Sequence, residues 1–352
     1  MKNLTAPPQH ILVSRTDKIG DLILTLPLFQ SLKAKFPQAR LTALVSSYAK
    51  EIVTAHPAID QVETFDKGDG VFSLAGRIKK LNPDVFLAVY PRPSIAWAAA
   101  LAGVPTRIGT AYRWYSFLFN EKIAIHRHGG ERHEVDFNLD LAIPLGVSRS
   151  AQNIEFPVAP KDLEFVREFL KEKGVGPKVK YLIVHPGHKG SALNWSPVRY
   201  AEAIRQLSQI KNLRVILTAG PDETPLVSKV MTFLTDLPRD KKPVLLIGEL
   251  GLKQLAALYQ GAACFLSGST GTMHLAAAVG TPTVSLFCPI PSTTPVRWGP
   301  WGNEATVFLP KRVDCADCNR GVCSRHDPMD NIAVAEVVFA VQKHLLKKGK
   351  KK

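Results

Sequence analysis

Short apolar runs alternate with helical patterns along almost the whole chain, and this alternation limits the fold more than any other feature. In the first half, strands are predicted at residues 11–14, 41–45, 62–65 and 85–90, and helices around 21–36, 48–55 and 71–80. In the second half, strands are predicted at residues 181–185, 214–218, 244–247, 264–267 and 283–287, and helices near 198–210, 223–236, 251–261 and 272–279. Strands and helices in alternation predict parallel sheets covered by helices on both faces, so the expected fold class is α/β.

The pattern occurs twice, which predicts two doubly wound domains in a chain of 352 residues. A proline-containing connector at 156–160, followed by a helix at 161–173, separates the two halves. The predicted divisions are residues 1–160 for the N-terminal domain, 161–332 for the C-terminal domain, 333–346 for a last helix and 347–352 for a basic tail. The last helix could lie on either domain, and it is assigned to pack back on the N-terminal one.

The chain is strongly basic, with a net charge of +15. Such a surface attracts polyanions such as nucleic acid, anionic lipid or phosphorylated glycans. Residues 1–10 contain no hydrophobic leader region, and no apolar run reaches the ~18 residues of a membrane span. We therefore expect a cytoplasmic protein. The basic tail could add affinity for an anionic membrane.

The first candidate site lies where the first predicted strand ends. The apolar run at 11–13 stops at a polar, glycine-containing loop, and a helical pattern starts at Asp21. Ligand sites in open α/β sheets form at such strand ends. Arg15 and Lys18 flank the carboxylate, and both these cations and the helix N-terminus favour its ionised form. Asp21 is therefore either a general base or simply the residue that caps the helix.

A second candidate site follows the first strand of the second half, in the segment HPGHKGSALNW at 185–195. Backbone amides made accessible by Gly187 and Gly190 could approach a phosphate, and Lys189 could neutralise its charge. His185 and Ser191 lie in the same segment. The alternative is a flexible surface loop without a ligand.

Two further strand ends in the second half carry polar residues. Anion binding is predicted at a helix start, where free amides are joined by hydroxyl groups; the residues are Ser269, Thr270, Gly271 and Thr272. His274 in the same helix is either a packed side chain or a contributor to the site. Asp222 or Glu223 could hold ribose hydroxyls or cap the next helix. The dinucleotide fingerprint G-x-G-x-x-G is absent from both halves, which argues against an NAD enzyme.

The cysteines divide into two groups. Cys264 and Cys288 lie in apolar runs and are predicted to be core residues. Cys315, Cys318 and Cys323, with His326, have a spacing that could bind zinc as a Cys3His site. The alternative is a loop of free thiols, and no second C-x-x-C pair supports the metal site.

In several segments the residues match a known family. The matching pieces, in chain order, are RTDKIGDLILTLP at the front, ERHEVDFNLDLAIPLGV at 131–147, HPG near 185, WSP at 195–197, GPDE at 220–223, GELGLKQLAALYQGA at 248–262 and STGTMHLAAAVGTPTVSLF at 269–287. On these pieces, the chain resembles glycosyltransferase family 9, the heptosyltransferases of lipopolysaccharide core synthesis. Two positions depart from the family pattern: Leu193 stands where a lysine is common, and Ser269 stands where an aspartate is common.

The resemblance implies a GT-B architecture, in which two Rossmann-like domains face each other across a cleft. It implies an inverting transferase that needs no cofactor or metal for chemistry, with Asp21 as base and Glu223 on the ribose. The donor would be ADP-heptose, held by the C-terminal domain. The acceptor would be a phosphorylated lipid A–Kdo or inner-core sugar, held by the N-terminal domain. Its anionic groups would be bound by basic residues of that domain, namely Arg15, Lys18, Arg92, Arg113, Arg132 and His133.

Two other function classes stay open at this point. One is a nucleotide-sugar epimerase or hydrolase of the same architecture. The other is a polyanion-binding protein without activity, although the chain lacks a recognisable nucleic-acid-binding motif and nucleic acid is not an expected partner. Residues 95–119 mix aromatic side chains with Arg107 and Arg113. This segment is either packed into the domain or a lipid-facing patch that gives peripheral contact with the inner membrane.

Overall fold

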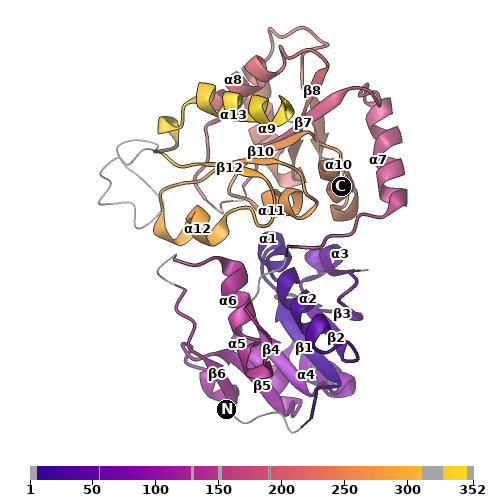
Figure 1. Ribbon diagram of the computed structural model, residues 1–352, viewed down its shortest axis with the longest axis vertical. Helices are drawn as coiled ribbons and strands as arrows, with labels where there is room; N and C mark the ends of the chain where they lie inside the picture. The colour runs from indigo at the N-terminus through magenta and orange to yellow at the C-terminus, as the bar shows by residue number, and fades with distance from the viewer. Residues whose placement is uncertain are drawn as a thin grey trace. The chain divides into compact units, whose positions relative to one another are not determined.

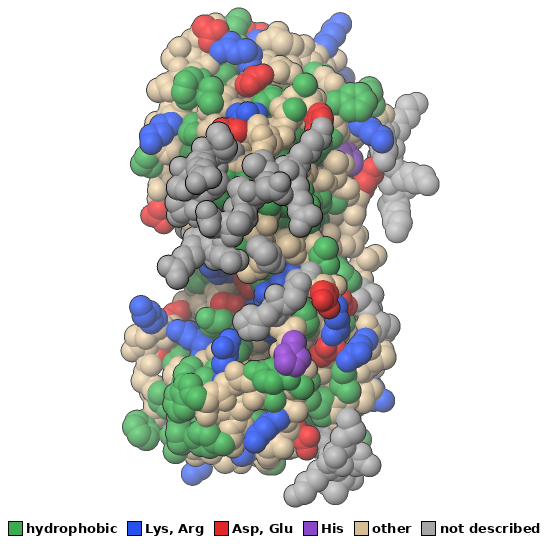
Figure 2. Space-filling view, turned by 90° about the vertical axis from the view of Figure 1, so that its left-hand side faces the viewer, with side chains coloured by type: hydrophobic (Ala, Val, Ile, Leu, Met, Phe, Trp, Pro, Cys, Tyr) green, Lys and Arg blue, Asp and Glu red, His purple; other side chains and the backbone are tan. Residues whose placement is uncertain are grey.

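The computed structural model describes residues 6–54, 56–127, 131–149, 153–188, 190, 192–310 and 328–346. The chain divides into two compact units, Met1–Glu155 and Phe156–Lys352. Each unit contains one parallel sheet with helices on both faces (Figure 1). Basic side chains are spread over the surface of both units (Figure 2), as a net charge of +15 requires.

The N-terminal unit is built on a six-stranded parallel sheet with the strand order β3-β2-β1-β4-β5-β6. Its strands are β1 (His10–Arg15), β2 (Arg40–Val45), β3 (Gln61–Thr64), β4 (Val85–Ala88), β5 (Thr106–Thr110) and β6 (Glu121–Ile123). In the register of the central strand, Ile11 lies opposite Leu41 of β2 and Val85 of β4. Strand β1 is buried along its whole length, as its continuous apolar run predicts for a strand covered on both faces.

The C-terminal unit repeats this topology. Its strands are β7 (Lys180–His185), β8 (Leu213–Ala219), β9 (Val244–Ile247), β10 (Cys264–Gly268), β11 (Thr283–Leu286) and β12 (Ala305–Phe308). The strand order β12-β11-β10-β7-β8-β9 is the same as in the first unit when the strands are counted from β7. In each sheet the chain first adds strands on one side of the central strand and then on the other. The change of side falls between the neighbouring strands β1 and β4 and between β7 and β10. The carboxyl ends of these strands are therefore where ligand sites are expected.

Helices cover both faces of each sheet (Figure 1). In the N-terminal unit they are α1 (Ile19–Ile23), α2 (Leu26–Lys35), α3 (Lys50–Val53), α4 (Val71–Leu81), α5 (Pro93–Leu101) and α6 (Glu134–Asp140), with 3₁₀ turns at η1 (Ser47–Ala49), η2 (Ser116–Leu118) and η3 (Ile143–Leu145). In the C-terminal unit they are α7 (Pro160–Glu172), α8 (Pro197–Leu207), α9 (Thr224–Thr232), α10 (Leu252–Gln260), α11 (Gly271–Ala278), α12 (Pro295–Trp298) and α13 (Val334–Leu346), with 3₁₀ turns at η4 (Pro221–Glu223), η5 (Pro291–Thr293) and η7 (Pro328–Asn331). The prediction of two doubly wound Rossmann-like domains is confirmed.

The single helix predicted at 21–36 is two helices. Helix α1 ends at Ile23 and α2 begins at Leu26, because Pro27 has no N–H to continue the helical hydrogen bonds. The Leu28 amide bonds to the Thr25 carbonyl instead of the Leu24 carbonyl. The side-chain amide of Asn138 donates to the Leu24 oxygen over 3.0 Å, so the break is satisfied by a residue of α6.

The prediction that the last helix packs back on the N-terminal domain is corrected. The apolar stripe of α13, which includes Val337 and Val341, lies in the hydrophobic core of the C-terminal unit. The residue two before α13 is held by Trp195, just before α8, and by Arg199 of α8, because Trp195 Nε1 and Arg199 Nη1 both donate to the Ile332 carbonyl over 3.2 Å. The apolar stripe of α13 is therefore buried against α8.

Of the predicted strands, all nine are present, and the structure adds β5, β6 and β12. Cys264 and Cys288 are buried free thiols, as predicted. Among the described residues, no helix is both long and apolar enough to span a bilayer. Several predicted features lie outside the described residues: the tail at 347–352, Lys189, Ser191, and the zinc-site candidates Cys315, Cys318, Cys323 and His326.

Candidate active site

The carboxyl end of β1 carries a buried arginine surrounded by acids. Arg15 is only 2 % exposed. Its Nε atom donates to Asp17 Oδ1 over 2.8 Å, and its Nη2 atom donates to Asp21 Oδ1 over 2.5 Å. Its Nη1 atom donates to Glu134 Oε1 and Asn138 Oδ1, both over 3.2 Å. Residues from the β1 loop, α1 and α6 are therefore fixed around one guanidinium, which we call the Arg15 cluster (Arg15, Asp17, Asp21, Glu134 and Asn138).

A second arginine contacts the Arg15 cluster. Arg127 Nη1 lies 3.3 Å from Glu134 Oε1, on the carboxylate that Arg15 also contacts. Burial alone would lower the pKa of Arg15, but the carboxylates of Asp17, Asp21 and Glu134 raise it, so the guanidinium stays charged. Burial raises the pKa of Asp17 to about 7 against the opposing effect of Arg15, and the nearby Asp21 carboxylate adds to the rise. Asp17 therefore keeps its proton to a higher pH than an ordinary aspartate does.

Asp21 does not cap a helix. Helix α1 begins at Ile19, its N-cap residue is Lys18 in an extended conformation, and no side chain makes a cap hydrogen bond there. The capping alternative for Asp21 is therefore wrong, and Asp21 is the third residue of the helix. Its side chain is 17 % exposed, in contrast to the fully buried Glu134. A solvent-accessible carboxylate at a strand end, held by a buried arginine, can accept a proton from a bound hydroxyl group.

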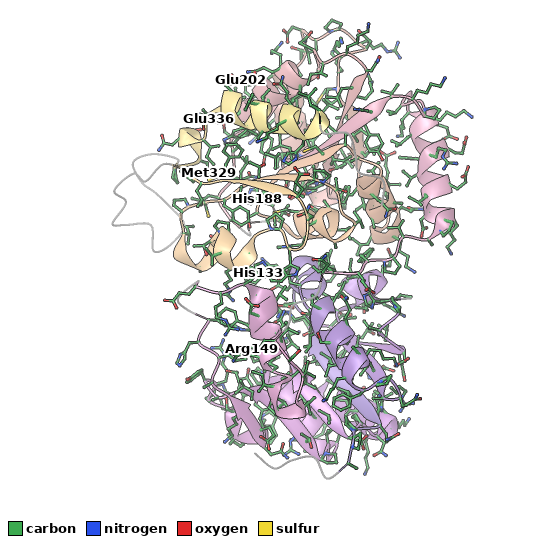
Figure 3. All side chains as sticks on the ribbon, viewed as in Figure 1. His133, Arg149, His188, Glu202, Met329 and Glu336 are labelled. Atoms are coloured by element: carbon green, nitrogen blue, oxygen red, sulfur yellow. The ribbon has the colours of Figure 1, made fainter. Side chains whose placement is uncertain are left out.

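Helix α6 contributes the buried acid through its own N-terminal turn. His133 is the N-cap residue, and its Nδ1 atom accepts from the Val135 amide over 3.2 Å. Figure 3 shows His133 at the start of α6. The predicted acceptor residue His133 is thus part of the structure that positions Glu134. This position of Glu134 lets it stabilise Arg15 from the opposite side to Asp17.

The other predicted acceptor residues fall into three places. Arg92, the N-cap residue of α5, donates to Thr16 Oγ1 over 3.4 Å, so it lies beside the β1 loop that also carries the exposed Lys18. Arg132 makes a bidentate contact with Asp140, at 2.7 and 3.2 Å. Arg149 shares this carboxylate at 2.7 Å. Arg113 is exposed just before η2, away from the hydrogen bonds of the Arg15 cluster.

Three residues of the cluster were not predicted as site residues: Asp17, Glu134 and Asn138. Asp17 lies four positions before Asp21, in the same polar loop after the first apolar run, so the same sequence pattern could have identified it. Glu134 lies within the segment ERHEVDFNLDLAIPLGV that carried the family resemblance. Only the contact of α6 with the β1 loop, across more than 110 positions of sequence, shows that they act on one guanidinium.

The raised pKa of Asp17 predicts a pH-dependent stability. The unfolded-state value is ~3.9, so between that pH and about 7 the folded protein holds a proton that the unfolded chain releases. This contribution to stability is complete below the unfolded pKa and is lost as the pH rises through the folded pKa. Asp17→Asn removes the ionisation, so its Tm should rise relative to wild type between pH 5 and pH 8. Arg15 and Asp21 act on the Asp17 carboxyl, and the Tyr48 hydroxyl donates to the Asp17 backbone carbonyl.

Asp66→Asn is the control for this pH experiment. The hydrogen bond from Ser47 lowers the pKa of Asp66, so any contribution of this group is lost only as the pH falls through that lowered value. Its Tm difference from wild type should be the same at pH 5 and pH 8. A constant difference for Asp17→Asn as well would show that Asp17 is ionised across this range.

In the C-terminal unit, His185 ends β7 and is part of the sheet core. Its Nδ1 atom lies 2.9 Å from Thr218 Oγ1 of β8, and its ring stacks on Phe265 of β10 with centroids 6.2 Å apart. The ring is 6 % exposed. Its place at the end of the central strand fixes where the next residues, 186–188, leave the sheet. Figure 3 shows His188 in this loop, and its Nδ1 atom accepts from the Gly190 amide over 3.1 Å.

Glu223 lies at the end of β8 and closes its own turn. Its Oε2 atom accepts from the Gly220 amide over 3.0 Å within the 3₁₀ turn η4; Glu223 is the N-cap residue of α9 but makes no side-chain cap hydrogen bond to that helix. The same carboxylate lies directly against Gly187, where an added Cβ would overlap it. The β7 loop and the β8 turn are thus in contact, and only a glycine at position 187 allows this approach.

Asn194 connects the β7 loop to the end of β10, and the sequence did not identify it. Its Nδ2 atom donates to the Pro186 carbonyl over 2.9 Å, and its Oδ1 atom accepts from the Tyr200 hydroxyl over 2.7 Å. Gly268 packs so closely on this side chain that a Cβ there would lie 2.5 Å from Oδ1. The signal available was the glycine in the segment GSTGT, since a glycine at a strand end often marks a close approach.

The predicted anion site at 269–272 lies at the start of α11, directly after β10. Thr270 is the N-cap residue in an extended conformation, and Gly271 is the first helical residue. The first amides of a helix lack intrahelical acceptors and favour anions. His274 is buried, at 5 % exposure, within this helix. The structure therefore brings Gly187 and Glu223 together and places 269–272 at the end of the strand next to β7.

Comparison with known proteins identifies the family. A family model described as glycosyltransferase family 9 (heptosyltransferase) matches residues 71–327. A Haemophilus influenzae protein described as a glycosyltransferase is 32 % identical over 307 residues, which cover 83 % of this chain and 86 % of the relative. Lipopolysaccharide heptosyltransferase 3 of Escherichia coli is 26 % identical over 346 residues, with 93 % and 96 % covered.

Comparison with solved structures agrees with the sequence comparison. The solved structure of the E. coli ADP-heptose LPS heptosyltransferase II aligns with a TM-score of 0.78 at 19 % identity, covering 96 % of this chain and 99 % of the other. At this identity the likeness shows the fold, which is of the GT-B type. With the family match extending over most of the sequence, the chain belongs to glycosyltransferase family 9, the heptosyltransferase family, and is a glycosyltransferase.

Proposed function

We propose that the protein transfers heptose from ADP-heptose to a phosphorylated inner-core acceptor of lipopolysaccharide, with Asp21 as the general base. The observation that carries the proposal is the Arg15 cluster. It holds two partly exposed carboxylates, Asp17 (14 %) and Asp21 (17 %), at the carboxyl end of the central strand of its sheet, and we take the more exposed Asp21 as the base. That is where a ligand is expected in this topology.

The step is a single displacement. The acceptor oxygen forms a bond to the anomeric carbon while the bond from that carbon to the diphosphate oxygen breaks, and the configuration inverts. The acceptor proton passes to Asp21. Because Arg15 engages Oδ1, we assign proton acceptance to Oδ2. The leaving nucleoside diphosphate takes the electron pair and gains negative charge, which oriented amides and cations stabilise.

For the donor we propose the C-terminal unit. The amides at the start of α11 and the loop 186–190 would bind the diphosphate, and Glu223 would bind the ribose. The contact between Gly187 and Glu223 supports this assignment, because it places a carboxylate beside the proposed phosphate loop. Lys189 and Ser191 are also proposed to bind the donor, on the basis of the sequence alone. The similarity to the E. coli ADP-heptose LPS heptosyltransferase II and to lipopolysaccharide heptosyltransferase 3 supports the choice of donor. Arg92 and Lys18 would hold the acceptor's phosphate groups beside the Arg15 cluster.

The donor assignment is tested by thermal shift with ADP, UDP, GDP and CMP and with their sugar conjugates. A ligand that binds the native state raises its Tm by mass action. We expect ADP and ADP-heptose to give the largest shifts. A larger shift with another nucleotide would change the donor and leave the transferase assignment intact.

A turnover assay with donor alone separates transfer from the alternative activities. A transferase should release little nucleotide until a phosphorylated inner-core acceptor is added. An epimerase or hydrolase would convert the donor without it, and such an outcome would contradict the proposal.

Gly187→Ala tests the donor site directly. The new methyl group would overlap the Glu223 carboxylate, so that side chain must move from its present position. We expect roughly tenfold weaker donor binding, with the fold retained, because overpacking at one site costs about 1–3 kcal/mol. Isothermal titration with ADP measures the change. Gly176→Ala, where the methyl group meets nothing within 4 Å, is the matched control and should bind as wild type.

A further inference from the structure

Helices α4 and α5 and the turn η2 form one layer on the N-terminal sheet, and the outer surface of this layer is unusually apolar. Four large side chains from α5 and the η2 turn are exposed: Trp97 (38 %), Leu101 (51 %), Trp114 (73 %) and Phe117 (60 %). We call these four residues the aromatic patch. Figure 2 shows hydrophobic side chains gathered on one face of this unit, with Lys and Arg side chains along their border.

The patch is continuous. The rings of Trp97 and Phe117 meet edge to face, with centroids 5.9 Å apart. Leu101 follows Trp97 by four positions on α5, which places both on the same helix face. Trp114 precedes Phe117 by three positions in the same turn, and its ring packs against Tyr115 at 5.4 Å.

The patch is not an incompletely buried part of the core. The inner face of α5 fills the core with small side chains, among them Ala96, Ala98 and Ala99, and Tyr115 and Leu118 do so for the η2 turn. The four patch residues are absent from that buried core, and between 38 % and 73 % of each residue stays exposed. A contiguous exposed apolar surface of this kind marks an interaction site.

The surroundings of the patch are cationic. Residues 85–120 contain no aspartate or glutamate, and they contain Arg92, Arg107 and Arg113. The Arg107 guanidinium bonds to the Leu118 and Val104 carbonyls, so its charge is fixed beside η2. On the neighbouring helix α4, Lys79 and Lys80 are exposed, and that helix has no acidic residue. The complementary partner is therefore both apolar and anionic.

We propose that the aromatic patch docks the N-terminal unit on the surface of an anionic lipid bilayer. Tryptophan and arginine side chains together suit the boundary between headgroups and acyl chains, where one end of the side chain is apolar and the other is hydrated. A second copy of this chain fits less well, because a symmetric contact through this surface would bring cations against cations. The inference rests on the proposed function, since an acceptor that carries lipid is presented at such a surface.

The test is sedimentation of the full chain with vesicles of phosphatidylcholine alone and of equal parts phosphatidylcholine and phosphatidylglycerol. The wild type should sediment with the anionic vesicles and far less with the neutral ones. Trp114→Ser with Phe117→Ser should weaken this binding on the order of tenfold or more, because two large apolar side chains no longer insert. Phe339→Ser is the matched control, since Phe339 is 69 % exposed on α13 of the C-terminal unit and should not affect binding.

Three outcomes would overturn the proposal. The double variant could bind anionic vesicles as the wild type does. A chain ending at Leu346 could lose all binding while the double variant loses none, which would assign the affinity to the basic tail. Light scattering could instead show a wild-type dimer that the double variant abolishes, which would make the patch an interface between copies.

A failure of the inference can be distinguished from a failure of the proposed function. With a short, lipid-free acceptor, the double variant should transfer sugar at the wild-type rate. Asp21→Asn should lose transfer and still sediment with anionic vesicles. Loss of transfer to the lipid-free acceptor in the double variant would place the patch in the acceptor site instead.

Discussion

Asp21→Asn should lower kcat for sugar transfer by about 10²–10⁴-fold, the usual contribution of a general base. Asparagine keeps the size of the side chain and can still accept a hydrogen bond from Arg15, but it cannot take the acceptor's proton. Donor binding should be unchanged, because the proposed donor residues lie in the other unit. The measurements are the transfer rate under saturating substrates and the thermal shift given by ADP.

The matched control for this variant is Asp162→Asn. Asp162 is also an aspartate in the first turn of a helix, α7, but it lies outside the candidate site. Its replacement should leave kcat and the ADP shift at wild-type values. If Asp21→Asn transfers sugar at the wild-type rate with an unchanged fold, Asp21 is not the base.

Arg15→Met should destabilise the N-terminal unit by about 3–5 kcal/mol, the cost of breaking a buried ion pair by removing one partner. The methionine leaves Asp17 and Asp21 without the Arg15 guanidinium, and it removes the contact of Arg15 with the buried Glu134. Asn138 also loses the donor to its Oδ1 atom. Urea unfolding should show an early transition for this unit in the variant.

Arg167→Met provides the comparison for this experiment. Arg167 pairs with Glu164 at 2.6 Å, but both side chains are 60 % exposed. Exposed pairs contribute about 0–1 kcal/mol, so the urea transition should hardly move. Equal effects of the two substitutions would mean that the Arg15 cluster stabilises the fold no more than a surface ion pair.

The strands with the clearest sequence signal are those buried on both sides, although the partly buried edge strands β3 and β9 were also predicted and β5, inside its sheet, was missed. Strands β1, β7 and β10 are continuous apolar runs because helices cover both faces of each sheet, and such runs are visible without any knowledge of pairing. Strands β6 and β12 lie at the sheet edges, are only partly buried and carry polar residues, so their sequences resemble loops. To predict the break between α1 and α2, one would have had to recognise that Pro27 interrupts an otherwise helical pattern.

For the candidate site too, some features could be predicted from the sequence and others only from the fold. The sequence by itself determined the strand ends that carry the candidate sites, because a polar loop after an apolar run marks such an end wherever it occurs. Only the tertiary structure decided that Asp17, Asp21 and Glu134 share one buried guanidinium, and that Gly187 lies against Glu223. The physical reason is that strand and helix formation depend on neighbours within a few positions of sequence. The charge of a buried group depends instead on partners that the fold brings from more than a hundred positions away.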